Sequence, residues 1–167
     1  MSTSAFDAET AVVAQGDSRY GVRLSTAWDI GDNANGGYAM LPVLRALRQE
    51  SGHSDPLSIT THFLRPIQGG GDAQIDTSLV RRGRSVSVLT GALTVAETQR
   101  LTVNAVFGDI DDHELGTGID IPAPMIPTPA ECLNRSELLQ GIALPIASRL
   151  DVRVPADGDL HPLRAVE

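Results

Sequence analysis

The residues best suited to chemistry lie in a polar, glycine-bearing turn that runs directly into an apolar segment. The turn contains Asp32, Asn35, Gly36 and Gly37, and Tyr38 begins the apolar segment. The first backbone N–H groups of a helix have no partner within it, and the helix dipole makes that end partly positive. Because glycine also lets a ligand approach the backbone closely, the turn could hold an oxyanion, a phosphate or a polarised carbonyl.

The apolar segment is predicted to form a helix over residues 36–50. Apolar residues cover most of its girth, which is typical of a buried helix. Pro42 fits poorly, because proline inside a helix removes a hydrogen bond and can kink the chain. Either the helix begins near Tyr38, leaving Pro42 in its first turns, or it bends there. The turn also has an ordinary interpretation as an N-cap, with Asn33 or Asn35 as the capping side chain.

Strand-like segments lie on both sides of this helix. Residues 18–26 precede it, and four segments follow without another helix, at 57–64, 72–80, 85–96 and 101–107. The alternation slips near Gly91, which indicates a bulge or a close backbone approach. Short turns join the later segments, so neighbouring strands must be antiparallel. The sequence therefore predicts an α+β fold, in which an antiparallel sheet of about five strands wraps around one central helix.

The character of the chain changes after residue 108. Residues 109–130 are acidic and proline-rich, as in an extended linker. Residues 131–144 could hold a short helix, and residues 147–154 have the pattern of a strand. We therefore predict a first domain over 1–108, a linker over 109–130, and over 131–167 the start of a second domain that this chain does not finish.

Composition excludes several classes of protein. The 167 residues carry a net charge of −8, and all 13 basic residues are arginine. An acidic chain without basic clusters is a poor candidate for binding nucleic acid or an anionic membrane. The lone cysteine, Cys132, fits a reducing compartment, and the first ten residues lack the pattern of a signal peptide. We therefore expect a cytoplasmic location.

The order of these elements, together with three motifs, resembles a known family. The motifs are NGGYAMLPVLRAL at the helix opening, THFLRP at the end of a strand, and RRGRSVSVLTGALT at the next hairpin. They resemble the hotdog fold and, more narrowly, the TesB-like acyl-CoA thioesterases of the acyl-CoA thioesterase II type. That family carries two hotdog domains in tandem. The match covers roughly Trp28 to Gly108 as a first hotdog, and residues 147–154 are similar to the start of a second.

This resemblance implies hydrolysis of an acyl-CoA to a free acid and CoA. The reaction needs a donor for the negative charge that grows on the carbonyl oxygen, and a polar group that positions or deprotonates water. The N–H groups of Gly37 and Tyr38 could be the donors, and Asn35 or Asp32 could contact water or substrate. In well-known bacterial members, however, the polar catalytic set lies mainly in the second hotdog, so a complete site is expected to need that domain.

Four further residues are candidates for substrate binding. His62 would lie near the thioester, and Arg65 near a CoA phosphate or a pantetheine oxygen. Arg82 and Arg84 could meet CoA phosphates. Each has a structural alternative: His62 as a partly buried sheet residue, and the arginines of RRGR as a solvated hairpin tip.

Other chemistries find less support. The histidines and the cysteine show no metal-ligand spacing, and G-x-S-x-G and G-x-x-x-x-G-K are both missing, so we expect neither a metal nor a cofactor. One alternative keeps the fold as a non-catalytic module that binds acyl-CoA or an acyl carrier. A hotdog dehydratase or hydratase is a weaker alternative. Those enzymes typically use a histidine together with an acid near the helix start, and no histidine lies near Asp32. An isolated hotdog leaves sheet edges uncovered, so the chain is expected to form a homo-oligomer or to pair with a second hotdog.

Overall fold

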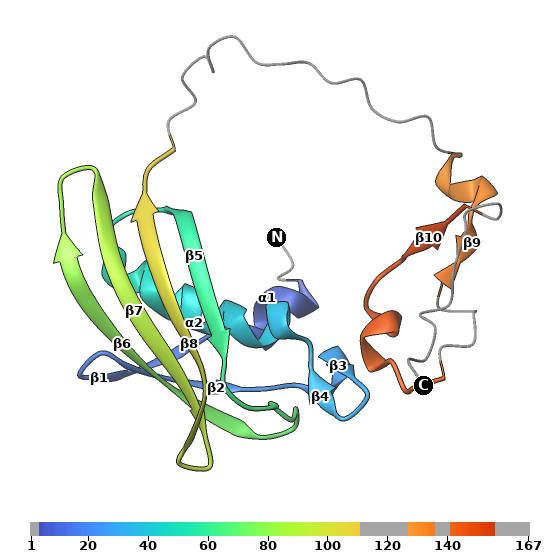
Figure 1. Ribbon diagram of the computed structural model, residues 1–167, viewed down its shortest axis with the longest axis horizontal. Helices are drawn as coiled ribbons and strands as arrows, with labels where there is room; N and C mark the ends of the chain where they lie inside the picture. The colour runs from blue at the N-terminus through green and yellow to red at the C-terminus, as the bar shows by residue number, and fades with distance from the viewer. Residues whose placement is uncertain (1–3, 111–126, 136–140, 156–167) are drawn as a thin grey trace, which may run out of the picture.

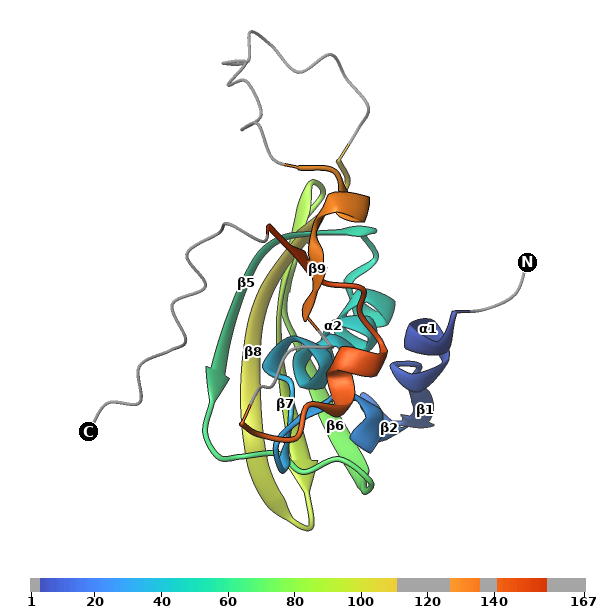
Figure 2. The ribbon, with the colours of Figure 1, turned by 90° about the vertical axis from the view of Figure 1, so that its right-hand side faces the viewer.

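The computed structural model describes residues 4–110, 127–135 and 141–155. Its main body is a six-stranded antiparallel sheet that curves around the helix α2 (Gly36–Ser51), in the strand order β1-β2-β6-β7-β8-β5 (Figures 1 and 2). The strands are β1 (Val13–Gly16), β2 (Arg19–Arg23), β5 (Asp55–Phe63), β6 (Asp72–Arg82), β7 (Val86–Val95) and β8 (Thr98–Gly108). The α+β class and the sheet wrapped around one helix are thereby confirmed.

Alternation along the strands builds the core between the sheet and α2. On β8, every second residue is buried against the helix: Leu101, Val103, Ala105 and Phe107. The helix buries the facing side with Tyr38, Ala39, Pro42, Val43, Leu44, Ala46, Leu47 and Ser51. Because side chains alternate between the two faces of a strand, this period fixes which face of the sheet meets α2.

Gly91 marks the closest approach between the sheet and α2. A Cβ atom there would lie 2.6 Å from Cγ1 of Val43 and 3.2 Å from Cδ2 of Leu47. The register shifts of β7 fall elsewhere, opposite the Leu79–Arg81 step of β6 and at its own Leu93–Thr94 step. The predicted close approach is therefore right, and the alternative of a bulge at Gly91 is wrong.

The ends of α2 follow from its terminal residues. Asn35 caps the first turn, and Gly52 ends the helix in the left-handed region, with φ +74°. The helix begins at Gly36, with Pro42 buried inside it, so the chain does not adopt the alternative start near Tyr38. The predicted start near Gly36 is confirmed.

Two N-terminal elements were not predicted. The helix α1 (Ala5–Glu9) places the ring of Phe6 edge-on against Trp28, with the centroids 4.9 Å apart, and β1 adds a sixth strand beside β2. Trp28, in the 3-10 helix η1 (Thr26–Trp28), is buried and stacks on Tyr38 with centroids 5.5 Å apart. Trp28 therefore anchors its loop on the core, as expected, with α1 as an added cover.

The described C-terminal segment differs from its prediction. Its elements are η2 (Pro129–Glu131), β9 (Leu133–Asn134), η4 (Pro145–Ser148) and β10 (Arg153–Val154), and β9 pairs with β10. The predicted strand over 147–154 is wrong for Ala147 and Ser148, which lie in the 3-10 helix begun by Pro145. The helix expected within 131–144 does not form at Leu133–Asn134; residues 136–140, like most of the predicted linker, lie outside the described residues.

This segment contacts the loop between η1 and α2. That loop forms a small hairpin of β3 (Asp29–Ile30) and β4 (Asn33–Ala34). The N–H of Gly31, at its tip, donates to the carbonyl of Ala143 over 2.7 Å. Arg149 forms an ion pair with Glu9 at 3.1 Å and lies over the ring of Trp28. Residues far apart in sequence thus meet beside the start of α2.

Candidate functional site

The start of α2 offers backbone donors. The side-chain oxygen of Asn35 accepts the N–H of Tyr38 over 3.1 Å, and the carbonyl of Asn35 accepts the N–H of Ala39. Asn35, not Asn33, is therefore the capping residue, and the N–H of Tyr38 is already used. Among the hydrogen bonds of the described residues, none uses the N–H of Gly36 or Gly37. These two groups are the donors left at the positive end of the helix dipole.

Phe63 covers the first of these glycines. A Cβ atom on Gly36 would lie 3.0 Å from Cζ of Phe63, so the ring packs directly over the glycine backbone. Phe63 ends β5, and the THFLRP motif continues from it. The fold therefore brings the two motifs NGGY and THFLRP together at the start of α2.

A first hollow of about 360 Å³ lies at this junction. It is lined by Asn33, Ala34, Gly36, Ala39, Phe63, Leu64, Arg65, Pro66 and Ile67. Arg65 is thus next to the start of α2, and its guanidinium donates to the carbonyl of Gln99 over 3.2 Å. Of the four residues predicted to bind substrate, Arg65 is the one that lines a hollow beside the glycine donors.

A second hollow of about 320 Å³ lies beside the same helix start and shares no lining residue with the first. It is lined by Ile30, Asn35, Arg135, Leu144, Ile146, Ala147, Leu150 and Val152. Six of these eight residues are apolar, and most come from the C-terminal segment. Gly36 therefore lines the first hollow and its neighbour Asn35 the second, whereas Gly37, also predicted as catalytic, lines neither.

Tyr38 and Asp32, both predicted as catalytic, are not among the residues that line these hollows. The hydroxyl of Tyr38 accepts the N–H of Ser25 at 2.8 Å and donates to the carbonyl of Glu9 at 3.2 Å. Burial is the main cause that raises the pKa of Tyr38 above its ordinary value. Its contacts are those of a core residue that joins η1, α1 and α2. Asp32 lies exposed in the turn between β3 and β4.

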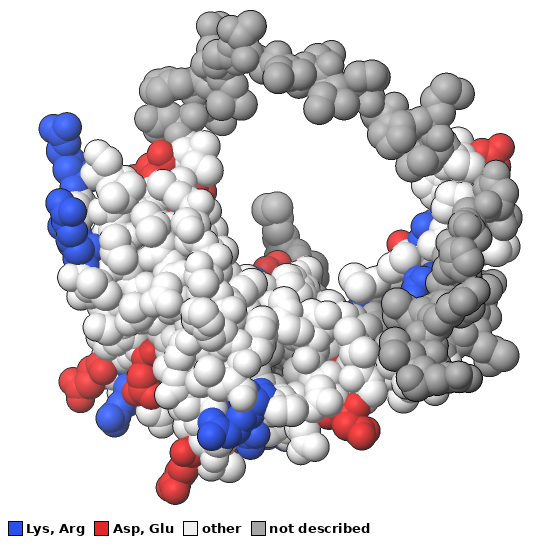
Figure 3. Space-filling view, in the orientation of Figure 1, with Lys and Arg blue, Asp and Glu red and all other residues white. Residues whose placement is uncertain are grey.

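His62 and the hairpin arginines also lie apart from the helix start. His62 pairs with Thr102, between the buried Leu101 and Val103, so it occupies the sheet face opposite α2. Arg82 and Arg84 lie at the β6–β7 turn, where Figure 3 shows basic side chains at one end of the molecule.

These arginines and the glycine donors lie at opposite ends of α2, so about the length of that helix separates them. Arg82 donates to the carbonyl of Glu50 over 2.6 Å, at the C-terminal end of α2. With 16 residues, α2 spans about 24 Å. The structure therefore separates Arg82, Arg84 and His62 from the residues it gathers around Gly36.

Asp29 is a buried acid that sequence reasoning missed. It is 6% exposed, and its Oδ1 has no hydrogen-bond partner within the described part of the chain. Burial raises the pKa of Asp29, the nearby N–H of Gly69 offsets part of this effect, and the charge of Asp32 adds to it.

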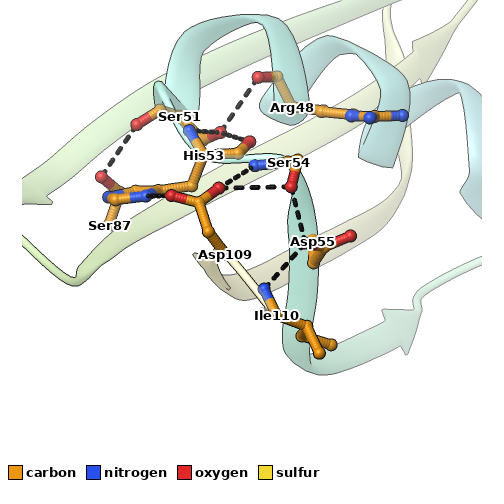
Figure 4. Close-up of polar contacts among 8 residues, drawn as sticks. All are labelled: Arg48, Ser51, His53, Ser54, Asp55, Ser87, Asp109 and Ile110. Carbon is orange, nitrogen blue, oxygen red and sulfur yellow. Dashed lines mark hydrogen bonds and ion pairs between the residues drawn. The ribbon is translucent and has the colours of Figure 1, made fainter. Parts of the chain in front are cut away.

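A group of polar side chains lies at the other end of α2 (Figure 4). His53 Nδ1 contacts the Asp109 carboxylate at 2.8 Å, and the N–H of Ser54 donates to the same carboxylate at 2.9 Å. His53 is the main cause that lowers the pKa of Asp109. The hydroxyl of Ser87 donates to the carbonyl of Ser51.

This group does not have the arrangement of a nucleophile and its base. In the described residues, no serine hydroxyl bonds to the ring of His53; the contacts of Ser51 are with its backbone. The group instead ties the end of β8 to the end of α2, where the chain leaves the sheet.

Both hollows lack an acid. No carboxylate is among the described residues that line them, and the buried Asp29 lies in the hairpin before α2 without lining either hollow. In the described ranges, no group of three or more His, Cys, Asp or Glu side chains has an arrangement that could hold a metal ion. Every helix described here is too short or too polar to cross a membrane.

Comparison with known proteins identifies this arrangement. A family model described as the acyl-CoA thioesterase N-terminal domain matches residues 24–108. A protein from Thermobifida fusca YX, provisionally named a thioesterase II, is 31% identical with a TM-score of 0.78, over 92% of this chain and 55% of that chain. A protein of unknown function with a hot dog fold, from Alicyclobacillus acidocaldarius, is 23% identical with a TM-score of 0.72, over 88% and 53%.

More distant structures share the fold. The acyl-CoA thioesterase II TesB2 of Mycobacterium marinum is 14% identical with a TM-score of 0.60, over 79% of this chain and 48% of that chain. The predicted hotdog fold is confirmed, and the chain spans about half of the length of these structural relatives. No curated protein matches it.

Proposed function

This chain belongs to the acyl-CoA thioesterase family, and from that premise we propose that it is one half of an enzyme that hydrolyses acyl-CoA to a free acid and CoA. The observation that carries the proposal is the pair of unused N–H groups, Gly36 and Gly37, at the start of a buried helix, where Gly36 lines one hollow and Asn35 lines a second. Fixed donors at a developing negative charge are among the largest contributions to catalysis.

The chemistry follows from this geometry. The oxygen of water adds to the thioester carbonyl carbon, and the carbonyl oxygen takes the negative charge that Gly36 and Gly37 stabilise. The C–S bond then breaks, the sulfur leaves with the bonding electron pair and takes up a proton, and the acid is released. Water must lose a proton on the way, which requires a base.

The base is proposed to come from a second hotdog domain, because both hollows are without a carboxylate. We keep the predicted division into a hotdog over 1–108, a linker over 109–130 and the start of a second hotdog over 131–167. The pairing is proposed to use β5, an edge of the sheet in the described residues; β5 exposes Leu57 by 48% and Phe63 by 55%, and Leu64 directly after it is 48% exposed.

An assay of the complete gene product and of residues 1–167 on acyl-CoAs of different chain length tests the proposal. We expect turnover by the complete protein and much less by residues 1–167. If the complete protein hydrolyses no acyl-CoA, the enzyme proposal fails. Calorimetric binding of a CoA ester without hydrolysis would then favour the non-catalytic binding module.

The substrate, the metabolic context and the location are also proposals. Acyl-CoA is the expected substrate, and lipid metabolism is the expected context. A cytoplasmic location is proposed from the single cysteine, which fits a reducing compartment. Neither a nucleic acid nor a membrane is proposed as a partner, because the net charge of −8 opposes both.

A further inference from the structure

The apolar hollow beside Asn35 has the features of a binding pocket for a chain of methylenes. Its walls expose large apolar side chains, with Ile30 40%, Leu150 46% and Val152 41% exposed. Ile146, from the same wall, packs against the core on its other side. Apolar side chains gathered around a hollow are costly to leave in water and mark a place for an apolar ligand.

Its position relative to the glycine donors selects the ligand. Asn35 lines this hollow and is followed directly by Gly36, which lines the other. A thioester carbonyl held by the two N–H groups sends its acyl chain and its sulfur in different directions. The first hollow contains Asn33 and Arg65, which suit the amides and phosphates of the CoA arm. The second also contains Asn35 and Arg135, but it exposes more aliphatic surface than the first, which suits the acyl chain.

We propose that the hollow walled by Ile146, Ala147 and Leu150 binds the acyl chain, and that this C-terminal segment sets the preferred chain length. The inference rests on the proposed function. A cavity of about 150 Å³ holds the six carbons of benzene, so a hollow of about 320 Å³ holds on the order of twelve carbons. The pocket therefore fits medium-chain acyl groups, of roughly eight to twelve carbons.

Binding of non-hydrolysable S-alkyl-CoA thioethers tests this assignment. The dissociation constant is measured by calorimetry for the 167-residue chain and the complete gene product, with alkyl chains of four to sixteen carbons and with CoA alone. Trp28, the single tryptophan, lies under Arg149 of the same segment and gives a fluorescence readout. We expect affinity to rise about fourfold per methylene until the hollow is full, and then to level off.

Leu150→Phe is the decisive variant, and Leu133→Phe is its matched control. Both leucines are exposed, but only Leu150 lines the hollow. Leu150→Phe should move the levelling point to chains shorter by a few carbons while the affinity for CoA alone stays unchanged. Leu133→Phe should change neither quantity.

The possible failures are distinguishable. Thioethers that bind with an affinity independent of chain length overturn the acyl pocket and leave the thioesterase proposal standing. The same holds if Leu150→Phe has no effect and Leu64→Phe, in the first hollow, shortens the preferred chain instead. Chain-length dependence in residues 1–167 that disappears in the complete gene product means that another protein segment fills the hollow, and also overturns the inference. If the complete gene product neither hydrolyses acyl-CoA nor binds CoA, the proposed function itself fails.

Discussion

Asn35 is the residue that caps the start of α2. Its oxygen is occupied by the N–H of Tyr38, so its immediate effect is to hold the helix start that presents Gly36 and Gly37. Asn35→Ala should lower the free energy of unfolding by about 1 kcal/mol, since a helix cap is lost. Asn35→Ser should restore most of that loss, because serine also caps. Urea unfolding measures both, and equal losses for the two variants would contradict the capping role.

Asp29 should make stability depend on pH in a direction that can be worked out. Its pKa is raised in the folded state by burial, so the unfolded chain ionises first as pH rises. Its contribution is most favourable below the unfolded pKa of about 3.9. It is lost as pH rises through the folded pKa. Asp29→Asn should therefore become progressively more stable than the natural chain between about pH 3.5 and pH 7.

Thermal unfolding across this pH range measures the difference between Asp29→Asn and the natural chain. Asp32→Asn is the control, because Asp32 is exposed and acts on Asp29 only through its charge. It should shift stability in the same direction and by less. A difference for Asp29→Asn that is constant with pH would show that the buried carboxyl keeps its ordinary pKa.

The packing of α2 against β7 is decided at Gly91. Gly91→Ala places a methyl group 2.6 Å from Cγ1 of Val43, and overpacking of this kind costs roughly 1–3 kcal/mol. Val43→Ala in the same chain should recover part of that loss. Ala92→Val, on the opposite face of the strand, should stay within about 0.5 kcal/mol of the natural chain. If Gly91→Ala has no effect on unfolding, the close approach of the two elements is wrong.

Elements whose signal is local could be predicted from the sequence. The alternation of Leu101 to Phe107 and the apolar girth of α2 each depend on neighbouring residues alone. The helix α1 was missed because five residues show too little periodicity, and its residues are not buried. The strand expected at Ala147 was wrong because Pro145 begins a 3-10 turn there. Turn chemistry thus overrode the short strand pattern at Ala147, whereas α1 was too short to give a pattern.

Residues brought together over long distances in the chain could not be predicted. The second hollow depends on the bond between Gly31 and Ala143, which joins segments more than a hundred residues apart in sequence. The carboxyl of Asp29 lies against Gly69, forty residues away in the chain, and no pattern around Asp29 encodes that contact. The start of α2 was singled out from the sequence because NGGY is a local signal, but the apolar wall of the second hollow and the burial of Asp29 were not predicted.

At the scale of the whole molecule, the open edge at β5 should determine the state of association. Within the described residues, β5 leaves one side of its backbone unpaired at the sheet edge, and it exposes Leu57, Ile59 and Phe63 beside that edge. Residues 1–167 should therefore dimerise at micromolar concentration. Ile59→Lys should shift them toward monomer, because a charge would be buried in the interface. Ser78→Lys, on the exposed part of β6 away from this edge, should leave the dimer intact. Light scattering measures both. A monodisperse monomer of the natural 1–167 chain, or equal dissociation by the two lysine variants, would rule out β5 as the pairing surface.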